Sequence, residues 1–254
     1  MDTKDAVRER FGAAASHYAE SWPHAAGPDL AALVTAAELR ESDTALDVGC
    51  GAGHTAFALA GGAARVVALD LTQAMLEQTR AGASERGLPH VEAREGDAED
   101  LPFEDESFDV VTSRLAAHHF PRAERFVNEA HRVLRPGGRF VLSDTISPDD
   151  DAQDTYGNAL EVLRDPSHVR NHRVRDWLGM VQRAGFTAPL DQGRFACPLD
   201  FEIWTDRMDT PPAAREGIQA LFRAAPEDVA SNFQIDPDGR SWQLEIAVLS
   251  ARKP

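Results

Sequence analysis

A short apolar run that leads directly into a glycine-rich turn constrains this chain more than any other feature. It reads Leu46-Asp47-Val48-Gly49-Cys50-Gly51-Ala52-Gly53-His54 and precedes a helix-like segment. Glycine allows the backbone to turn tightly after a strand and to approach a ligand closely. His54 stands where the dinucleotide pattern Gly-x-Gly-x-x-Gly requires its last glycine, so that fingerprint is not satisfied. The turn indicates a strand, loop and helix with a ligand at the loop, and leaves the ligand open.

The rhythm of the following hundred residues places this unit in a parallel sheet. Strands are predicted at residues 45–48, 65–69, 90–94, 109–112 and 139–143, with helices at 55–60, 73–86 and 122–134 between them. The turn Arg135-Pro136-Gly137-Gly138 stops the last of these helices. With late strands near 193–197 and 242–249, the pattern predicts an α/β, Rossmann-like fold. Its sheet is expected to be seven-stranded and mostly parallel, with helices on both faces.

Length and composition favour a single domain over residues 1–254, because 43% of the residues are hydrophobic. Residues 1–42 are expected to form N-terminal helices, at 2–22 and 29–40, that cap one side of the sheet. Residues 43–147 form a cofactor-binding core, residues 148–240 carry substrate-side insertions with a late strand, and residues 241–254 close the sheet. Helical insertions at 152–164, 174–184 and 200–228 are placed as a lid.

The charge balance limits the partners of this chain. Its 42 acidic and 26 basic residues give a formal net charge of −16, which repels nucleic acid and anionic membranes. Cys50 and Cys197 lie far apart, so neither a disulfide framework nor a cysteine-rich zinc site is indicated, and a cytoplasmic location is expected. No signal peptide and no membrane-inserted segment are predicted. The expected partner is a small molecule, and a homodimer is left open.

Two acids downstream of the glycine turn narrow the choice of ligand. Asp70 ends the second predicted strand, where a carboxylate can accept hydrogen bonds from both ribose hydroxyls. Asp97 follows the third strand, where it can accept one from an adenine amino group. With Asp47, three acids are expected to line one crevice. Such a crevice suits a sulfonium cation carrying an amine, because carboxylates repel a pyrophosphate.

Successive motifs along the chain resemble those of the class I methyltransferases. They are Leu46–Gly53, Asp70, Gly96–Leu101, Ser107-Phe108-Asp109-Val110-Val111 and Leu134-Arg135-Pro136-Gly137-Gly138. The branch that the chain resembles is the type 11 group, which is similar to the ubiquinone/menaquinone-biosynthesis C-methyltransferases. The resemblance covers residues 11 to 144, and its weight comes from five motifs in order.

What the resemblance implies is a binding site for S-adenosylmethionine. Gly49 and Gly51 would pass the methionine part of the cofactor, Asp70 would hold the ribose, and Asp97 with Ala98 would frame the adenine. Asp47 either orients the glycine loop or contacts the cofactor, and Cys50 in that loop is more typical of a small buried filler than of a nucleophile. The remaining cofactor-binding candidates are Tyr18 as a closing aromatic, Leu71 and Met75 around the adenosine, and Ser113, Arg114 and His118 around the methionine.

Candidates for acid–base chemistry and for acceptor binding come from two short stretches. His118 and His119 are adjacent and are expected to point in different directions, which argues against a metal site. His119 or His168 is predicted to deprotonate the acceptor. Arg164, His168 and Arg170 form a charged cluster that would grip the acceptor, and the alternative is a solvated turn after a helix.

The sequence therefore predicts an enzyme that transfers the methyl group of S-adenosylmethionine to a small-molecule acceptor and releases S-adenosylhomocysteine. The attacked atom, whether carbon, oxygen or nitrogen, stays open. One alternative is a protein that binds adenosylmethionine without methyl transfer, because such motifs report binding rather than chemistry. The other is an NAD-dependent oxidoreductase, which His54 and Asp97 disfavour.

Overall fold

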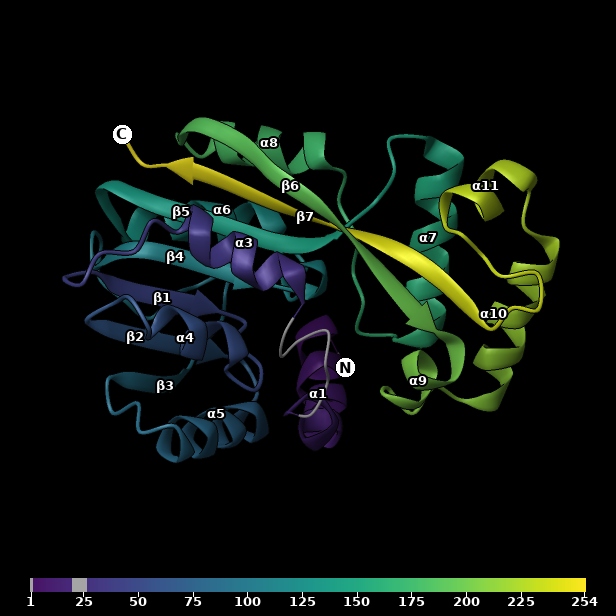
Figure 1. The fold of residues 1–254 in the computed structure, drawn as a ribbon, viewed down its shortest axis with the longest axis horizontal. Coiled ribbons are helices and arrows are strands. Elements are labelled where there is room, and N and C mark those ends of the chain that lie inside the picture. The colour runs from purple at the N-terminus through teal and green to yellow at the C-terminus, as the bar shows by residue number, and fades with distance from the viewer. Residues whose placement is uncertain (1, 20–26) are drawn as a thin grey trace.

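The described part of the chain forms a seven-stranded sheet with the order β3-β2-β1-β4-β5-β7-β6 (Figure 1). The computed structural model describes residues 2–19 and 27–254, and for residues 13–19 it describes the main chain only. Strands β1 to β5 run parallel, and β7 runs antiparallel to both β5 and β6. The prediction of a mostly parallel, Rossmann-like sheet is confirmed. The strands are β1 (Thr44–Val48), β2 (Arg65–Asp70), β3 (Val91–Glu95), β4 (Phe108–Arg114), β5 (Leu134–Ile146), β6 (Thr187–Asp200) and β7 (Ser241–Arg252).

Alternate residues of the central strands face two helical layers. Ala45 and Val66 pack on one side against helices α3, α4 and α5. Leu46 and Val67 pack on the other side against α6 and α8. Both faces are thus buried, which explains why the strands read as continuous apolar runs. The helices of these layers are α3 (Pro28–Ala36), α4 (His54–Leu59), α5 (Gln73–Glu85), α6 (Ala123–Val133) and α8 (Val174–Arg183).

The strand order reverses beside β1, because the chain passes from β1 outward to β2 and β3 and then returns to β4 on the other side. Open α/β sheets leave a crevice at the carboxyl ends of the strands where the order reverses. The glycine turn follows β1 at this edge. The topology alone therefore places that turn at the mouth of a crevice.

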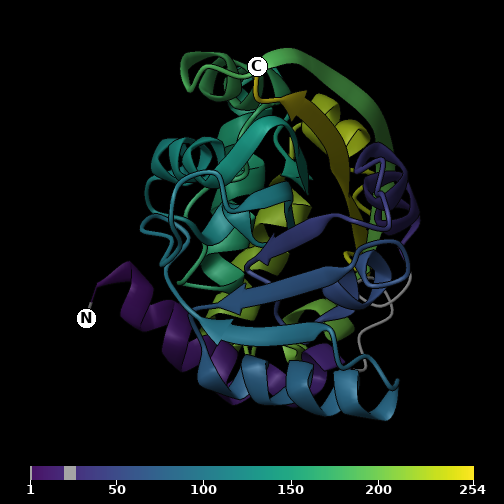
Figure 2. The same cartoon turned by 90° about the vertical axis from the view of Figure 1, so that its left-hand side faces the viewer.

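The remaining helices gather beyond the carboxyl ends of the strands. Figure 1 shows α7, α9, α10 and α11 around the far ends of β6 and β7, with α1 between them and the sheet. They have an apolar core of their own, in which Trp204 and Trp242 meet edge to face at 4.8 Å. Figure 2 shows α1 running along α5. These helices are α1 (Thr3–Ala19), α7 (Asp151–Arg164), α9 (Phe201–Asp206), α10 (Pro212–Ala224) and α11 (Glu227–Asn232), with the single 3-10 turn η1 (Ala117–His119) at the end of β4.

The helical insertion predicted at 200–228 is present as the short helices α9, α10 and α11, with Pro211 and Pro226 as the N-caps of the last two. Two other expectations about the elements need correction. The two N-terminal helices do not cap one side together, because α3 packs on the sheet while α1 lies at the strand ends. Residues 135–138 belong to β5, where Gly137 donates its N–H to the carbonyl of Lys253 and the pairing with β4 shifts register.

Candidate functional site

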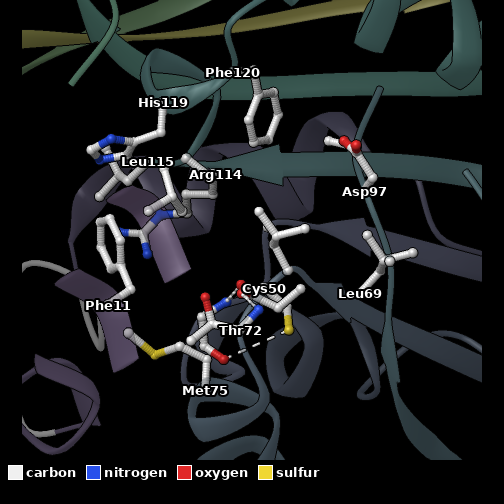
Figure 3. Close-up of a pocket in the computed structure, with 18 of the residues that line it drawn as sticks. Phe11, Cys50, Leu69, Thr72, Met75, Asp97, Arg114, Leu115, His119 and Phe120 are labelled. Atoms are coloured by element: carbon white, nitrogen blue, oxygen red, sulfur yellow. Dashed lines mark hydrogen bonds between the residues drawn. The ribbon is translucent and has the colours of Figure 1, made fainter. Parts of the chain in front are cut away.

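A cavity of about 950 Å³, open to solvent, lies at the carboxyl ends of β1, β2, β3 and β4 (Figure 3). Figure 3 shows Phe11, Arg114, Leu115 and His119 at one end of the cavity and Asp97 at the other. Its wall consists of Lys4, Val7 and Phe11 of α1; Gly49, Cys50, Gly51, Ala52, His54 and Thr55; Leu69, Asp70, Leu71, Thr72 and Met75; Gly96, Asp97, Ala98 and Glu99; and Arg114, Leu115, Ala116, His119, Phe120 and Pro121.

The glycine loop forms the floor of this cavity in a conformation that requires glycine. Gly49 and Gly51 have φ angles of +71° and +52°, in the left-handed region that other residues rarely adopt. A Cβ atom on Gly49 would lie 2.6 Å from the Cβ atom of Ala116. A Cβ atom on Gly51 would meet nothing within 4 Å, so this glycine leaves its backbone open to the cavity.

Asp70 connects the glycine loop to the end of β2. Its two carboxylate oxygens accept hydrogen bonds from the backbone N–H groups of Gly51 and Thr72, both at 2.9 Å. Burial raises the pKa of Asp70 above its ordinary value, although these two donors act in the opposite direction. Each carboxylate oxygen has two lone pairs, so Asp70 retains acceptor capacity toward the cavity it lines.

An ion-pair network of Lys4, Asp97 and Glu99 closes the end of the cavity that lies away from His119. This network was not predicted from the sequence. The ammonium of Lys4 on α1 lies 2.6 Å from Asp97 and 2.7 Å from Glu99. Glu99 also accepts a hydrogen bond from the backbone of Arg122. Although burial raises the pKa of Asp97, the Lys4 ammonium and the Glu99 amide hold it below its ordinary value.

Helix α1 crosses the cavity from this network to the other end. Lys4 and Phe11 are seven residues apart, about 10 Å along a helix, and Val7 lies between them on the same face. That spacing is the signal in the sequence that would have indicated a cavity-facing helix. The predicted aromatic Tyr18 belongs to the same helix, and its side chain lies outside the described part of the structure.

Asp47 does not line the cavity. Of the three acids predicted to line one crevice, only Asp70 and Asp97 do so. Its side chain is buried beneath the glycine loop and accepts a hydrogen bond of 2.8 Å from the Thr112 hydroxyl. The other carboxylate oxygen has no hydrogen-bond partner among the described residues. Burial raises the pKa of Asp47 to about 7. Of the two roles left open for Asp47, support of the loop fits this position.

Arg114 reaches the cavity wall as part of a buried cluster. Its Nε donates to Asp29 at 2.6 Å and its Nη2 donates to the same carboxylate at 3.0 Å. The Ser143 hydroxyl donates to Asp29 as well, at 2.9 Å. Ser113, predicted beside Arg114, does not line the cavity, because alternate residues of a strand point to opposite faces.

The two neighbouring histidines lie closer together than expected. The rings of His118 and His119 are 4.3 Å apart, because the 3-10 turn η1 does not separate successive side chains as a strand does. His119 lines the cavity, with the Phe11 ring edge-on at 4.8 Å, whereas His118 does not. Burial, together with the neighbouring His118, lowers the pKa of His119 to about 4. His119 is therefore a neutral imidazole at the cavity wall.

The structure does not bring the charged cluster after α7 to the cavity. Arg164 is buried against Glu161 and the Trp204 ring, and Arg170 is paired with Asp154. His168 contacts Asn158 through Nε2, at 3.2 Å, and burial lowers its pKa to about 2. Each of these side chains is engaged within the fold, so the structure does not favour the prediction that they grip the acceptor and that His168 deprotonates it.

Residues 2–19 and 27–254 contain no group of three or more His, Cys, Asp or Glu side chains arranged to hold a metal ion. In the same ranges no helix has the length and apolar character needed to cross a membrane.

These features define a class of protein. A Rossmann-like sheet, an open glycine turn after β1 and acceptor groups after β2 and β3 form the nucleoside-binding crevice of a class I methyltransferase fold. The comparisons agree, because the family model of the methyltransferase domain matches residues 46–142. The chain is 36% identical over 225 residues to the uncharacterized methyltransferase YcgJ of Bacillus subtilis, an alignment that covers 89% of this chain and 88% of YcgJ.

Solved structures extend this similarity to three dimensions. The crystal structure of YcgJ matches with a TM-score of 0.85 at 34% identity, over 88% of this chain and 97% of that one. A putative methyltransferase of Bacillus halodurans matches with a TM-score of 0.84 at 40% identity, over 90% of this chain and all of the other. The ubiquinone/menaquinone biosynthesis C-methyltransferase UbiE of Brucella canis is 38% identical over 170 residues, 56% of this chain and 61% of UbiE.

The chain belongs to the S-adenosylmethionine-dependent methyltransferases, in the type 11 family. Family membership disfavours the alternative of an NAD-dependent oxidoreductase.

Proposed function

We propose that this enzyme binds S-adenosylmethionine in the cavity at the strand ends and transfers its methyl group to a small molecule. The observation that supports this most strongly is the placement of Asp70 and Asp97, after the adjacent strands β2 and β3, beside a glycine loop whose backbone is open at Gly51. When bound, the cofactor supplies an electrophilic methyl group on a sulfonium.

The residues present fit such a cofactor. Two cations, Lys4 and Arg114, and three carboxylates line the cavity, and both cations are already paired with acids. The lining therefore favours a cationic ligand over a polyphosphate. Asp70 would accept hydrogen bonds from the ribose hydroxyls, and Asp97 would accept one from the adenine amino group.

Apolar residues would hold the rest of the cofactor. Leu71, Met75 and Ala98 would pack on the adenosine, and Gly49, Cys50 and Gly51 would follow the methionine part. Arg114, fixed by Asp29, would wall the methionine end.

The acceptor would enter beside α1 at the end of the cavity that Figure 3 shows around Phe11, Leu115 and His119. These side chains exclude water and orient the acceptor, which supplies much of the rate of a bimolecular transfer. Because His119 is neutral, it can take the proton that the acceptor loses. That proton becomes strongly acidic as the new bond forms, so a weak base suffices.

Biological context follows from the same composition. We propose one domain because of the length and the 43% hydrophobic content, and a cytoplasmic location because the two cysteines lie far apart. The net charge of −16 supports a small-molecule acceptor and no nucleic-acid partner. A homodimer is a further proposal, which sedimentation would test.

Two experiments test the proposed function. Calorimetry with S-adenosylhomocysteine and with NAD should show binding of the first alone, and binding of NAD alone would overturn the proposal. A screen of small acceptors with methyl-labelled cofactor should then place label in a product. Tight binding without label in any product or release of S-adenosylhomocysteine would favour a protein that binds the cofactor without methyl transfer.

His119→Ala tests the role of His119 as the base separately from cofactor binding. We expect turnover to fall about a hundredfold or more while cofactor affinity stays within about twofold. His90→Ala is the matched control, because the His90 ring contacts the carbonyl of Ala60 away from the cavity, and it should retain most of the turnover. Unchanged turnover in His119→Ala would show that His119 is not the base.

A further inference from the structure

The chain segment that follows α7 braces the turn that carries His119. The backbone N–H groups of Val169 and Arg170 donate to the carbonyl of His118, at 2.9 and 3.0 Å. In the opposite direction, the carbonyl of Ser167 lies 3.0 Å from Nδ1 of His119. The two segments are thus joined on both sides of the turn, although 48 residues separate Ser167 from His119.

A carbonyl oxygen can only accept a hydrogen bond. The Ser167 hydroxyl also lies 3.4 Å from Nδ1 of His119, but its hydrogen is already donated to Asp165, so the carbonyl contact decides where the proton of a neutral His119 sits. Nδ1 must carry the hydrogen, and Nε2 then holds a lone pair. Among the described residues Nε2 has no hydrogen-bond partner, and the ring lines the cavity. The geometry therefore leaves the basic nitrogen for the acceptor.

Asp165 holds Ser167 in place. One of its carboxylate oxygens accepts both the backbone N–H of Ser167, at 2.9 Å, and the hydroxyl of Ser167, at 2.7 Å. The other oxygen is buried without a hydrogen-bond partner among the described residues. Asp165 is 1% exposed, so its charge acts on nearby groups with little screening by water.

Charged and titratable groups surround His119 on several elements. Asp165 favours its protonated form, as does Asp144 on β5, while His118 opposes it. Although burial lowers the pKa of His118, its contact of 2.6 Å with Asp144 raises it. His168 lies 6.2 Å away, ring to ring, and α1 contributes the uncharged Phe11.

We propose that Asp165, acting through Ser167, is the positioning residue for His119. It would fix the tautomer that offers Nε2 to the acceptor and stabilise the imidazolium that forms when His119 takes the proton. This inference rests on the proposed function, in which His119 is the base. In the step itself the acceptor's electron pair forms a bond to the methyl carbon and the carbon–sulfur bond gives its pair to sulfur. The acceptor's proton moves to Nε2.

Histidine NMR on the protein without acceptor tests the positioning role independently of activity. In protein labelled with 15N-histidine, we expect His119 to show a protonated Nδ1 and an unprotonated Nε2. In Asp165→Asn, which keeps the acceptor for the Ser167 amide, this tautomer should persist while the pKa of His119 falls. In Asp165→Ala, which removes the turn, the opposite tautomer should gain population.

Turnover provides the second measurement. With the acceptor found in the screen, Asp165→Asn should lower kcat about tenfold with little change in KM for the cofactor. Asp150→Asn is the matched control, because Asp150 likewise accepts backbone N–H groups, at the start of α7, and contacts no part of the cavity. It should leave the His119 signals and kcat unchanged.

Failure of the positioning role can be distinguished from failure of the proposed function. A wild-type His119 protonated on Nε2, or Asp165 variants whose His119 titrates as in the wild type, would overturn the positioning role even if methyl transfer is observed. Failure of every acceptor would bear on the proposed function alone, since the tautomer is read without one. Ser167→Ala, which keeps the carbonyl, should retain the tautomer, and its loss there would assign the effect to the hydroxyl instead.

Discussion

Asp70→Asn is the most informative single substitution for the cofactor site. Asparagine has the shape of aspartate, but it lacks the charge and replaces one acceptor oxygen with a donor amide. In the native site both oxygens already accept backbone N–H groups, at 2.9 Å, and the remaining lone pairs are those expected to hold the ribose. The amide would therefore oppose one backbone donor and lose one ribose contact, while the other contact would become weaker.

The expected rise in Kd follows from the number of hydrogen bonds to the ribose that are lost or weakened. A hydrogen bond to a charged group contributes about 1.5–3 kcal/mol, so the one ribose contact that is lost costs about that much, and the weaker second contact adds to it. At about 1.4 kcal/mol per factor of ten, the Kd for S-adenosylhomocysteine should rise at least about tenfold to a hundredfold. Titration calorimetry measures this directly.

A matched control separates binding from general damage. Asp109 also accepts a backbone N–H, from Thr44 at 2.8 Å, and it pairs with Arg135 away from the cavity. Asp109→Asn should bind S-adenosylhomocysteine like the wild type. If Asp70→Asn binds within about threefold of that control, Asp70 does not hold the ribose and the assignment of the cavity must change.

Three further substitutions test the rest of the site. Lys4→Met should speed hydrogen exchange in α1 and let the pKa of Asp97 rise, as NMR titration would show; an α1 as protected as in the wild type would contradict the ion-pair role. Gly49→Ala should lower the free energy of unfolding by more than Gly87→Ala in chemical denaturation. Both glycines have positive φ, which costs about 1–3 kcal/mol for other residues, but only Gly49 meets a neighbouring Cβ atom; equal losses would refute the packing argument. Because Asp47 has a raised pKa in the folded state, its stabilising contribution is present below pH 4 and is lost as the pH rises to about 7. The rise of about three pKa units corresponds to about 4 kcal/mol. Asp47→Asn should therefore show a smaller loss of stability than the wild type between pH 4 and pH 8, and identical pH profiles would be inconsistent with this shift.

Local pattern was enough to predict the sheet and the floor of the cavity. The glycine turn and Asp70 are set by the strands that precede them, and the parallel order brings those strand ends together. The side-chain direction of Asp47 was not predictable in the same way, because it depends on Thr112 of the neighbouring strand β4.

Contacts between distant parts of the chain account for what sequence analysis missed. Lys4 pairs with carboxylates 93 and 95 residues away, so no local pattern reports it. Asp165 and Ser167 look like a solvated turn in the sequence, and only the packing of that turn against η1 gives them a partner. Arg164 and Arg170 illustrate the converse, since a charged cluster in the sequence does not reveal that its partners lie within the fold.

The helices α9, α10 and α11 are inserted between β6 and β7 and pack into a core that shares no residue with the cores beside the sheet. A graft that exchanges residues 201–240 for those of a relative would have to retain the apolar side chains that meet Leu160 of α7 and Trp242 of β7, and it would leave the pairing of β5 with β7 intact. None of the residues of this core lines the crevice at the strand ends, so we expect such a graft to leave the lining of that crevice in place.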